Sequence, residues 1–317
     1  MEFGFYVPTR GPMATRDGYA SLAGRAEALG FDIIAVSDHV VIPSRIDSTY
    51  PYTVDGRYPG REECLEQFAI LATLAALTRR ARLLTSVMVV PHRPPVFAAK
   101  ALASIDVLSE GRLILGCGTG WMEEEFRALG APPIAERGRV TDEYIAAYRE
   151  LWTKDSPRFE GKYVRFSDIT FLPKPVQKPS PPIWIGGESG PALRRAAALG
   201  DGWYPIGDNP KFPLDTLERY RDGVGRLRAR AESVGRDPSA IALAYWVYAY
   251  SPKHRDALGG AGRALFSGEP GAIVDDIHAL AEIGVRHLVF TLLGPTLDQT
   301  LANMDRFAND VMTKARP

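Results

Sequence analysis

The 317-residue chain lacks the features that define several large classes of protein. Its only cysteines, Cys64 and Cys117, lie far apart and match no CxxC spacing, so neither a disulfide framework nor a thiolate zinc site is expected. No apolar run approaches the roughly 18 residues of a membrane-spanning helix, and the start, MEFGFYVP, does not resemble a signal peptide. The sequence therefore predicts a cytoplasmic protein with no membrane partner.

Charge and sequence motifs exclude further classes. Lysine plus arginine equals aspartate plus glutamate, 38 against 38, which gives no electrostatic reason to expect a nucleic-acid partner. The sequence has no GxxxxGK[ST] and no HExxH, and its five histidines form no HxH on a predicted strand. We therefore expect neither a P-loop nor a metal site.

Short strand-like runs alternate along the chain with helical patterns. Eight runs rich in β-branched or aromatic residues predict strands at 3–7, 33–36, 82–90, 112–117, 182–186, 202–206, 241–250 and 287–293. Apolar residues at helical spacing predict helices at 17–29, 66–78, 97–108, 140–152, 191–199, 214–234, 272–283 and 297–312. Apolar strands that alternate with helices favour a parallel sheet, and eight such units predict an α/β fold, a single (β/α)8 TIM-barrel domain over 1–317.

Two connections are too long to be simple turns, one after strand two and one in the unit of strand four. Residues 43–63 carry three prolines and three tyrosines and are predicted to form an ordered loop at the active site. Residues 154–181 are predicted to contain a small hairpin before strand five. Barrels carry function in such insertions, although either segment could simply cover the surface.

The strand at 33–36 ends directly in Ser37, Asp38 and His39. Because a barrel places its active site at the carboxyl ends of its strands, the acid and the imidazole are expected at the rim of the site. The alternative is that Ser37 or Asp38 caps a turn while His39 packs against its surroundings.

Glycine turns follow strands four and five. GCGTG at 116–120 is not the dinucleotide fingerprint, because Trp121 occupies the position of the third glycine. After strand five, IGGESG precedes Pro191, with Ser189 as a candidate helix cap; a helix start of this kind offers free N–H groups to a phosphate. Each turn taken alone is also compatible with a purely structural role.

The order of these features resembles the bacterial luciferase-like flavin monooxygenase superfamily, particularly its branch dependent on the deazaflavin coenzyme F420. The matching segments are EALGFDIIAVSDHV (27–40), LLTSVMVVPHRPP (83–95), LSEGRLILGCGTGWMEEEFRALG (108–130), ERGRVTDEY (136–144) and PPIWIGGESGPALRRAAALGDGWYP (181–205). The resemblance covers most of the first two thirds of the chain and implies a barrel with a bound flavin-type cofactor.

The resemblance also implies roles for individual residues. Asp38 and His39 match a pair that faces the cofactor ring, with His39 handling a proton and Asp38 holding the imidazole or contacting the ring. Ser86 and Val87 match a bulge in strand three with a cis peptide behind the ring. The residues that match backbone-lined cofactor turns are Gly118, Thr119 and Gly120 after strand four, and Gly186, Gly187, Glu188 and Ser189, the phosphate-binding turn, after strand five.

One position departs from the family pattern. Sugar-phosphate dehydrogenases of the deazaflavin branch carry a catalytic glutamate after the last glycine of the strand-four turn, where this chain has Trp121. Glu123, Glu124 and Glu125 follow on a helix and are expected to form a solvated face. The substrate of those enzymes is therefore not inherited by analogy.

The resemblance implies an F420-dependent oxidoreductase that transfers a hydride between the deazaflavin and a small organic substrate. The alternatives are an FMNH2-dependent luciferase-like monooxygenase and a flavin-binding protein without catalysis. A homodimer is implied, with the apolar helices at 69–78 and 96–108 as the interface, although these helices must in any case pack on the barrel. Residues 154–178 contain six basic residues that would attract the acidic tail of coenzyme F420 and so favour this cofactor: Lys154, Arg158, Lys162, Arg165, Lys174 and Lys178. The alternative is that these residues only keep the hairpin solvated.

Overall fold

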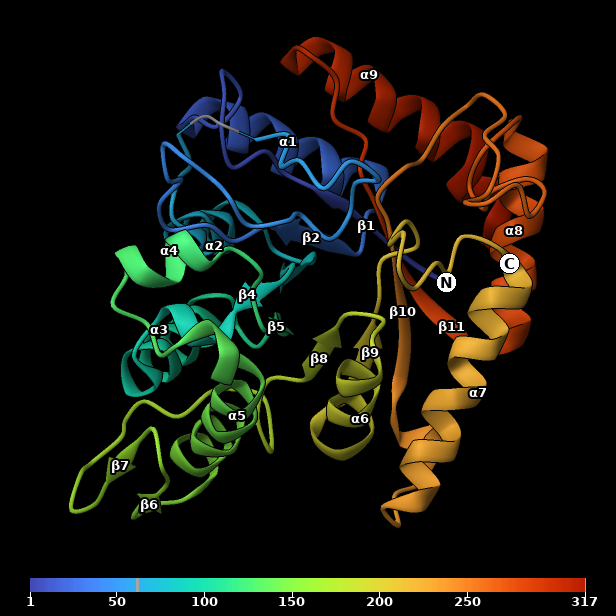
Figure 1. The fold of residues 1–317 in the computed structure, drawn as a ribbon. Coiled ribbons are helices and arrows are strands. Elements are labelled where there is room, and N and C mark those ends of the chain that lie inside the picture. Colours follow the sequence, from blue (N-terminus) through green and yellow to red (C-terminus); the bar gives the residue numbers. More distant parts are fainter. Residues whose placement is uncertain (61–62, 317) are drawn as a thin grey trace.

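The computed structural model describes residues 1–60 and 63–316, which form a barrel of parallel strands surrounded by helices (Figure 1). Eight strands in the described part of the chain make up the barrel: β1 (Glu2–Tyr6), β2 (Ile33–Val36), β3 (Arg82–Thr85), β5 (Leu113–Gly118), β8 (Ile183–Gly186), β9 (Gly202–Tyr204), β10 (Ala242–Val247) and β11 (Val285–Phe290). Each pairs in parallel with its neighbours, and the β1–β11 and β3–β5 pairings close the sheet on itself. The predicted (β/α)8 TIM barrel is confirmed.

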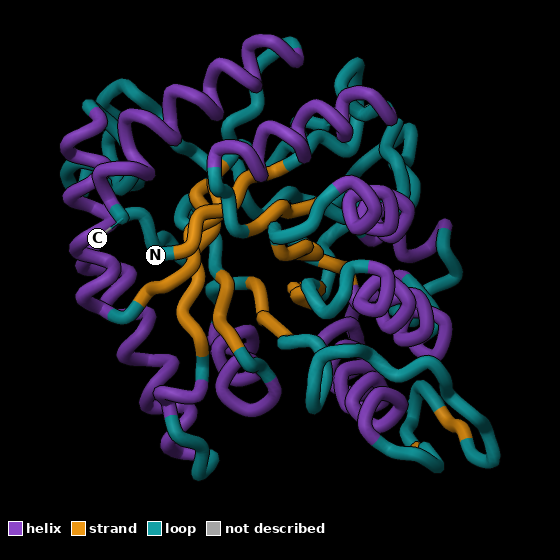
Figure 2. Tube along the Cα trace, turned by 180° about the vertical axis from the view of Figure 1, so that it is seen from behind, coloured by secondary structure: helices purple, strands orange, loops and turns teal. Residues whose placement is uncertain are grey.

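The helices lie outside the strands, as the view from behind shows (Figure 2). The principal helices are α1 (Arg16–Leu29), α2 (Gln67–Leu77), α3 (Pro95–Leu108), α5 (Arg137–Thr153), α6 (Gly190–Leu199), α7 (Leu217–Ser233), α8 (Pro270–Ile283) and α9 (Leu297–Phe307). The last predicted helix, 297–312, continues past α9 as a π-helical segment, Ala308–Met312, followed by α10 (Thr313–Ala315). A short helix that the periodicity had not resolved, α4 (Glu123–Ala128), precedes α5.

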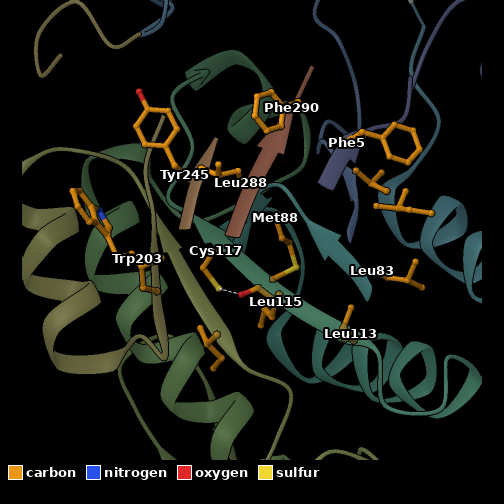
Figure 3. Close-up of a cluster of buried hydrophobic side chains, with 14 of the residues drawn as sticks. Phe5, Leu83, Met88, Leu113, Leu115, Cys117, Trp203, Tyr245, Leu288 and Phe290 are labelled. Carbon is orange, nitrogen blue, oxygen red and sulfur yellow. Dashed lines mark hydrogen bonds between the residues drawn. The ribbon is translucent and has the colours of Figure 1, made fainter. Parts of the chain in front are cut away.

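Alternation along the strands divides the core into two layers, because successive side chains of a strand point to opposite faces. The inner layer fills the barrel and contains Tyr6, Ile33, Leu84, Ile114 and Val289. The outer layer packs between strands and helices and includes Phe5, Leu83, Leu115, Leu288 and Phe290 (Figure 3). Both faces of every barrel strand are therefore apolar, which is why these strands read as continuous apolar runs.

The strand predicted at 82–90 is broken in the structure. It consists of β3 and the two-residue β4 (Met88–Val89), with a cis peptide bond between Ser86 and Val87, as predicted. Val87 lies between the two pieces, and its methyl groups pack where a Cβ on Gly118 or Gly186 would lie, 2.5 and 3.1 Å away. Glycine at these two positions therefore makes room for the bulge.

The two long connections lie where the sequence placed them. The first joins β2 to α2, although residues 61 and 62 of the predicted insertion, and Pro317, lie outside the described residues. The second follows α5 and contains an antiparallel hairpin of β6 (Phe159–Glu160) and β7 (Arg165–Phe166). Within residues 1–60 and 63–316, no helix is both long and apolar enough to span a membrane.

Candidate active site

A cavity of about 1140 Å³ opens at the carboxyl ends of the barrel strands. Every site residue predicted from the sequence lines it: Asp38, His39, Ser86, Val87, Gly118, Thr119, Gly120, Gly186, Gly187, Glu188 and Ser189. They come from the ends of β2, β3, β5 and β8, which parallel strands bring to one end of the barrel.

Asp38 is buried and forms an ion pair with Arg93. Its two carboxylate oxygens accept hydrogen bonds of 2.8 Å from Nη1 and Nη2 of Arg93, and one also accepts from the Val89 N–H at 2.9 Å. Burial would raise the pKa of Asp38, but the Arg93 guanidinium outweighs burial and holds it below the ordinary value. The carboxylate fixes the strand just beyond the Ser86–Val87 bulge, so the prediction that Asp38 holds the imidazole of His39 is wrong.

The partner of His39 is Glu125 on α4. Glu125 Oε2 lies 2.8 Å from His39 Nδ1, and Oε1 accepts from the Val40 N–H at 2.7 Å. Burial would raise the pKa of Glu125, but the hydrogen bond from His39 and its charge outweigh it, and the pKa lies below the ordinary value. Because a carboxylate only accepts hydrogen bonds, His39 Nδ1 carries the proton and Nε2 is left as the second functional nitrogen.

The expectation that Glu123, Glu124 and Glu125 form a solvated face is therefore only partly right. Glu123 is exposed and pairs with Arg127 at 3.1 Å. Glu124 accepts from the backbone N–H groups of Asp47 and Ser48, which ties α4 to the first insertion. Glu125 is completely buried. The burial of Glu125 could have been recognised in the sequence, because Met122, Glu125 and Phe126 share the buried face of a helical turn.

A second imidazole, His92, lies beside Glu125. Its Nδ1 is 3.9 Å from Glu125 Oε1, and neither ring nitrogen has a hydrogen-bond partner among the described residues. Burial lowers the pKa of His92. His92 is therefore held neutral, whereas His39 donates the direct hydrogen bond to Glu125.

The turn after β8 has the features of an anion site. Gly187 has φ 99°, a left-handed conformation that favours glycine, and Ser189 caps α6 by accepting from the Ala192 N–H. Pro191 occupies the first turn of the helix, as predicted. Arg137, Arg195 and Lys211 line the same cavity, and Arg195 is already paired with Asp142.

Glu188, which belongs to this turn, points both of its oxygens at protein donors. They accept hydrogen bonds from the Ile206 N–H at 2.8 Å and from Asn209 Nδ2 at 2.7 Å. Burial raises the pKa of its carboxyl from 4.5 to about 7. The side chain thus joins the turn after β8 to the loop after β9, and any contact of this turn with a phosphate falls to the backbone.

Three aromatic rings, Tyr50, Tyr58 and Trp121, form a group beside His39 that we call the aromatic cup. Their centroids lie 5.0 to 5.3 Å apart, and the Tyr58 ring is 5.2 Å from the imidazole. Tyr50 and Tyr58 come from the first insertion, whereas Trp121 follows the glycine turn of β5. Arg10 donates a 2.8 Å hydrogen bond to the Tyr58 hydroxyl. The insertion therefore contributes to the site.

The basic residues of the second insertion do not reach the cavity. None of the six lines it. Lys162 pairs with Glu136 at 2.9 Å, and Lys174 donates to the carbonyl of Leu151 at 2.7 Å. The cavity lining therefore does not support the hairpin as the binding surface for an acidic cofactor tail. Among the described residues, the cations that line the cavity are Arg10, Arg137, Arg195 and Lys211.

With this geometry in view, comparisons with known proteins identify the family. The luciferase-like monooxygenase family profile matches residues 1–258, and the chain belongs to this family. A protein of Mycobacterium tuberculosis is 36% identical over 232 residues, 73% of each chain. The FMNH2-dependent dimethylsulfone monooxygenase of Pseudomonas putida is 33% identical over 216 residues, 68% of this chain and 53% of that one.

Relatives of both cofactor types occur in these comparisons. The F420-dependent glucose-6-phosphate dehydrogenase of Intrasporangium calvum is 28% identical in an alignment 329 positions long, which covers 92% of each chain. Among solved structures, an F420-dependent secondary alcohol dehydrogenase in complex with an F420-acetone adduct superposes with a TM-score of 0.75. That alignment covers 100% of this chain and 99% of the other at 19% identity, which shows the shared fold. The protein is therefore an oxidoreductase of a family that uses flavin-type cofactors.

Proposed function

We propose that this protein is an F420-dependent oxidoreductase that moves a hydride between the deazaflavin and a small organic substrate. The observation that carries the proposal is the hydrogen-bonded pair of His39 and Glu125 at the wall of the cavity. Hydride transfer to or from a carbon that bears oxygen requires a proton to leave or reach that oxygen. A fixed imidazole with one nitrogen left for the substrate meets this requirement.

The residues of the cavity fit such a cofactor. Gly118 and Gly186 have no side chains beside Val87, so the ends of their strands present backbone to the cavity, and a flat ring can pack against it. The N–H groups of Gly186–Ser189 at the start of α6, together with Arg195 and Arg137, suit the cofactor phosphate. When bound, the deazaflavin would supply or accept the hydride.

Residues of the protein would transfer the proton and position the groups around the cofactor. Glu125 keeps the proton of the neutral imidazole on Nδ1, so that Nε2 accepts a proton from a substrate hydroxyl during oxidation. In the opposite direction, the protonated imidazole donates from Nε2 to a substrate oxygen. Asp38, through Arg93 and Val89, holds the strand that carries Ser86 and Val87.

An FMNH2-dependent monooxygenase is the second candidate function, and the Pseudomonas putida relative supports it. A flavin-binding protein without catalysis is the third. The His39–Glu125 pair argues against the third, because sequestration of a cofactor requires no oriented imidazole beside it.

Titration of the purified protein with coenzyme F420 and with FMN tests the proposal, at low and at moderate salt because screening weakens exposed charge interactions. We expect tighter binding of coenzyme F420. Preference for FMN together with oxygen-dependent turnover would establish the monooxygenase instead.

Variants of the pair test the proton transfer. His39→Ala should lower kcat by about 10²- to 10⁴-fold with little change in cofactor affinity. Glu125→Gln should lower kcat, because an amide can turn either its oxygen or its NH2 group toward Nδ1 and no longer fixes the imidazole proton there. Loss of cofactor affinity with retained turnover in His39→Ala would show that the imidazole only contacts the ring.

A further inference from the structure

The aromatic cup places three rings beside the imidazole that handles the proton. Tyr50 and Trp121 lie 5.0 Å apart, and both contact Tyr58, which lies against His39. Trp121 is itself 6.5 Å from the imidazole in an edge-on arrangement. A substrate whose reacting oxygen reaches His39 must therefore lie beside these rings.

Some of the polar groups near the cup are already paired. Arg10 donates to the Tyr58 hydroxyl at 2.8 Å. Of the described residues that line the cavity, Asp38 and Glu188 carry carboxyl groups. Asp38 is bound by Arg93, and Glu188 by Ile206 and Asn209. These paired groups have little hydrogen-bonding capacity left for a substrate with many hydroxyl groups. Arg10 Nη1, Trp246 Nε1 and Thr291 Oγ1 also belong to cavity-lining residues and have no partner among the described residues, so the cavity offers a small number of polar contacts beside its rings.

A second group of aromatic rings lines the same cavity. Trp246 stacks on Tyr6 with centroids 4.8 Å apart and meets Tyr248 edge-on at 5.6 Å. Trp246, Tyr248 and Leu293 line the same cavity as the cup. An apolar ring bound in this cavity would meet aromatic and aliphatic surface, and ring pairs of this kind favour offset or edge-on contacts.

We propose that the aromatic cup binds the substrate and that the substrate is an alcohol or carbonyl compound that carries an aromatic ring. This inference rests on the proposed F420-dependent function. In oxidation, the carbinol C–H bond breaks and its hydride passes to the oxidised deazaflavin. The O–H proton passes to Nε2 of His39, and a C=O double bond forms. Reduction of the carbonyl compound reverses each transfer, with the reduced deazaflavin as hydride donor.

Turnover of matched substrates measures the preference. We expect kcat/KM for 1-phenylethanol or acetophenone to exceed that for 2-propanol or acetone by roughly 100-fold or more, because even one methylene group in an apolar pocket discriminates by roughly 10- to 200-fold. Trp121→Leu should reduce this ratio at least tenfold. Phe159→Leu, in the hairpin outside the cavity, is the matched control and should leave the ratio as it is.

Binding without turnover separates the two proposals. Saturation-transfer NMR with acetophenone and acetone on the cofactor-free protein should show transfer to acetophenone that weakens in Trp121→Leu but not in Phe159→Leu. That result without F420-dependent turnover would support the cup while the proposed function fails. Two results would refute the proposal that the cup binds an aromatic substrate. One is turnover with coenzyme F420 but equal kcat/KM for aromatic and aliphatic substrates, and the other is a ratio of these kcat/KM values that Trp121→Leu does not change.

Discussion

Glu188 is a buried carboxyl whose replacement by glutamine tests the electrostatics of the cavity. Its oxygens accept only from neutral donors, the Ile206 N–H and the Asn209 amide, and burial raises its pKa from 4.5 to about 7. Because the unfolded chain has the ordinary pKa, this group makes the stability of the protein depend on pH.

The direction follows from which state holds the proton. Below pH 4.5 the carboxyl of Glu188 is protonated in both states, so its contribution to stability is fully present. Between pH 4.5 and about 7 the folded chain keeps the proton and the unfolded chain loses it, so the free energy of unfolding falls as pH rises. A difference of about 2.5 pH units at 1.36 kcal/mol each amounts to roughly 3 kcal/mol, which is lost by about pH 8.

Urea unfolding followed by circular dichroism at pH 4.5, 5.5, 6.5 and 8 measures this effect. Glu188→Gln cannot titrate, so its free energy of unfolding should gain roughly 3 kcal/mol relative to the wild type between the lowest and the highest pH. Glu160→Gln, on the exposed hairpin, is the matched control and should track the wild type. A difference between Glu188→Gln and the wild type that stays constant over this range would refute the reasoning.

Two further substitutions test the anion turn and the outer helices. Gly187→Val places a β-branched residue at φ 99°, with its Cβ 3.1 Å from that of Ala192, and should weaken cofactor binding tenfold or more in a fluorescence titration. Gly235→Val, at φ 72° with open space around it, is the control. Equal cofactor affinities of Gly187→Val and the wild type would place the phosphate elsewhere. Phe97 is 61% exposed on α3, and if α2 and α3 form the homodimer interface, Phe97→Asp should give monomers in sedimentation velocity while Val54→Asp, at an 83% exposed loop position, should not. A wild-type protein that is already monomeric would rule the interface out.

The fold was predictable from the sequence because its signals are local. Strand and helix periodicities, glycine helix ends at Gly30 and Gly284, and the capping serine Ser189 are each encoded within one segment. The break in the third strand was different. No periodicity marks Ser86 and Val87, and only the family resemblance located the bulge.

Partners of charged side chains were less predictable, because they lie far apart in the sequence. Arg93 is 55 residues from Asp38, and Glu125 is 86 residues from His39. Adjacent in sequence, Asp38 and His39 had suggested a single pair, but the structure gives each side chain a different partner. The Asp38 carboxylate binds Arg93 and the Val89 N–H of β4, whereas the His39 imidazole binds Glu125 of α4.

The three consecutive glutamates of α4 show how such a partner can be recognised. Successive residues of a helix point about 100° apart, so Glu123, Glu124 and Glu125 cannot share one face. Met122 and Phe126 define the buried face, and Glu125, three residues after Met122, must lie on it. A glutamate on an apolar face requires a donor, because an unpaired buried carboxylate is costly. Since the turn before α4 follows a barrel strand, that donor has to come from the carboxyl ends of the neighbouring strands. After Arg93 has paired with Asp38, two imidazoles remain there beside Glu125, and the structure gives the direct hydrogen bond to His39 rather than to His92.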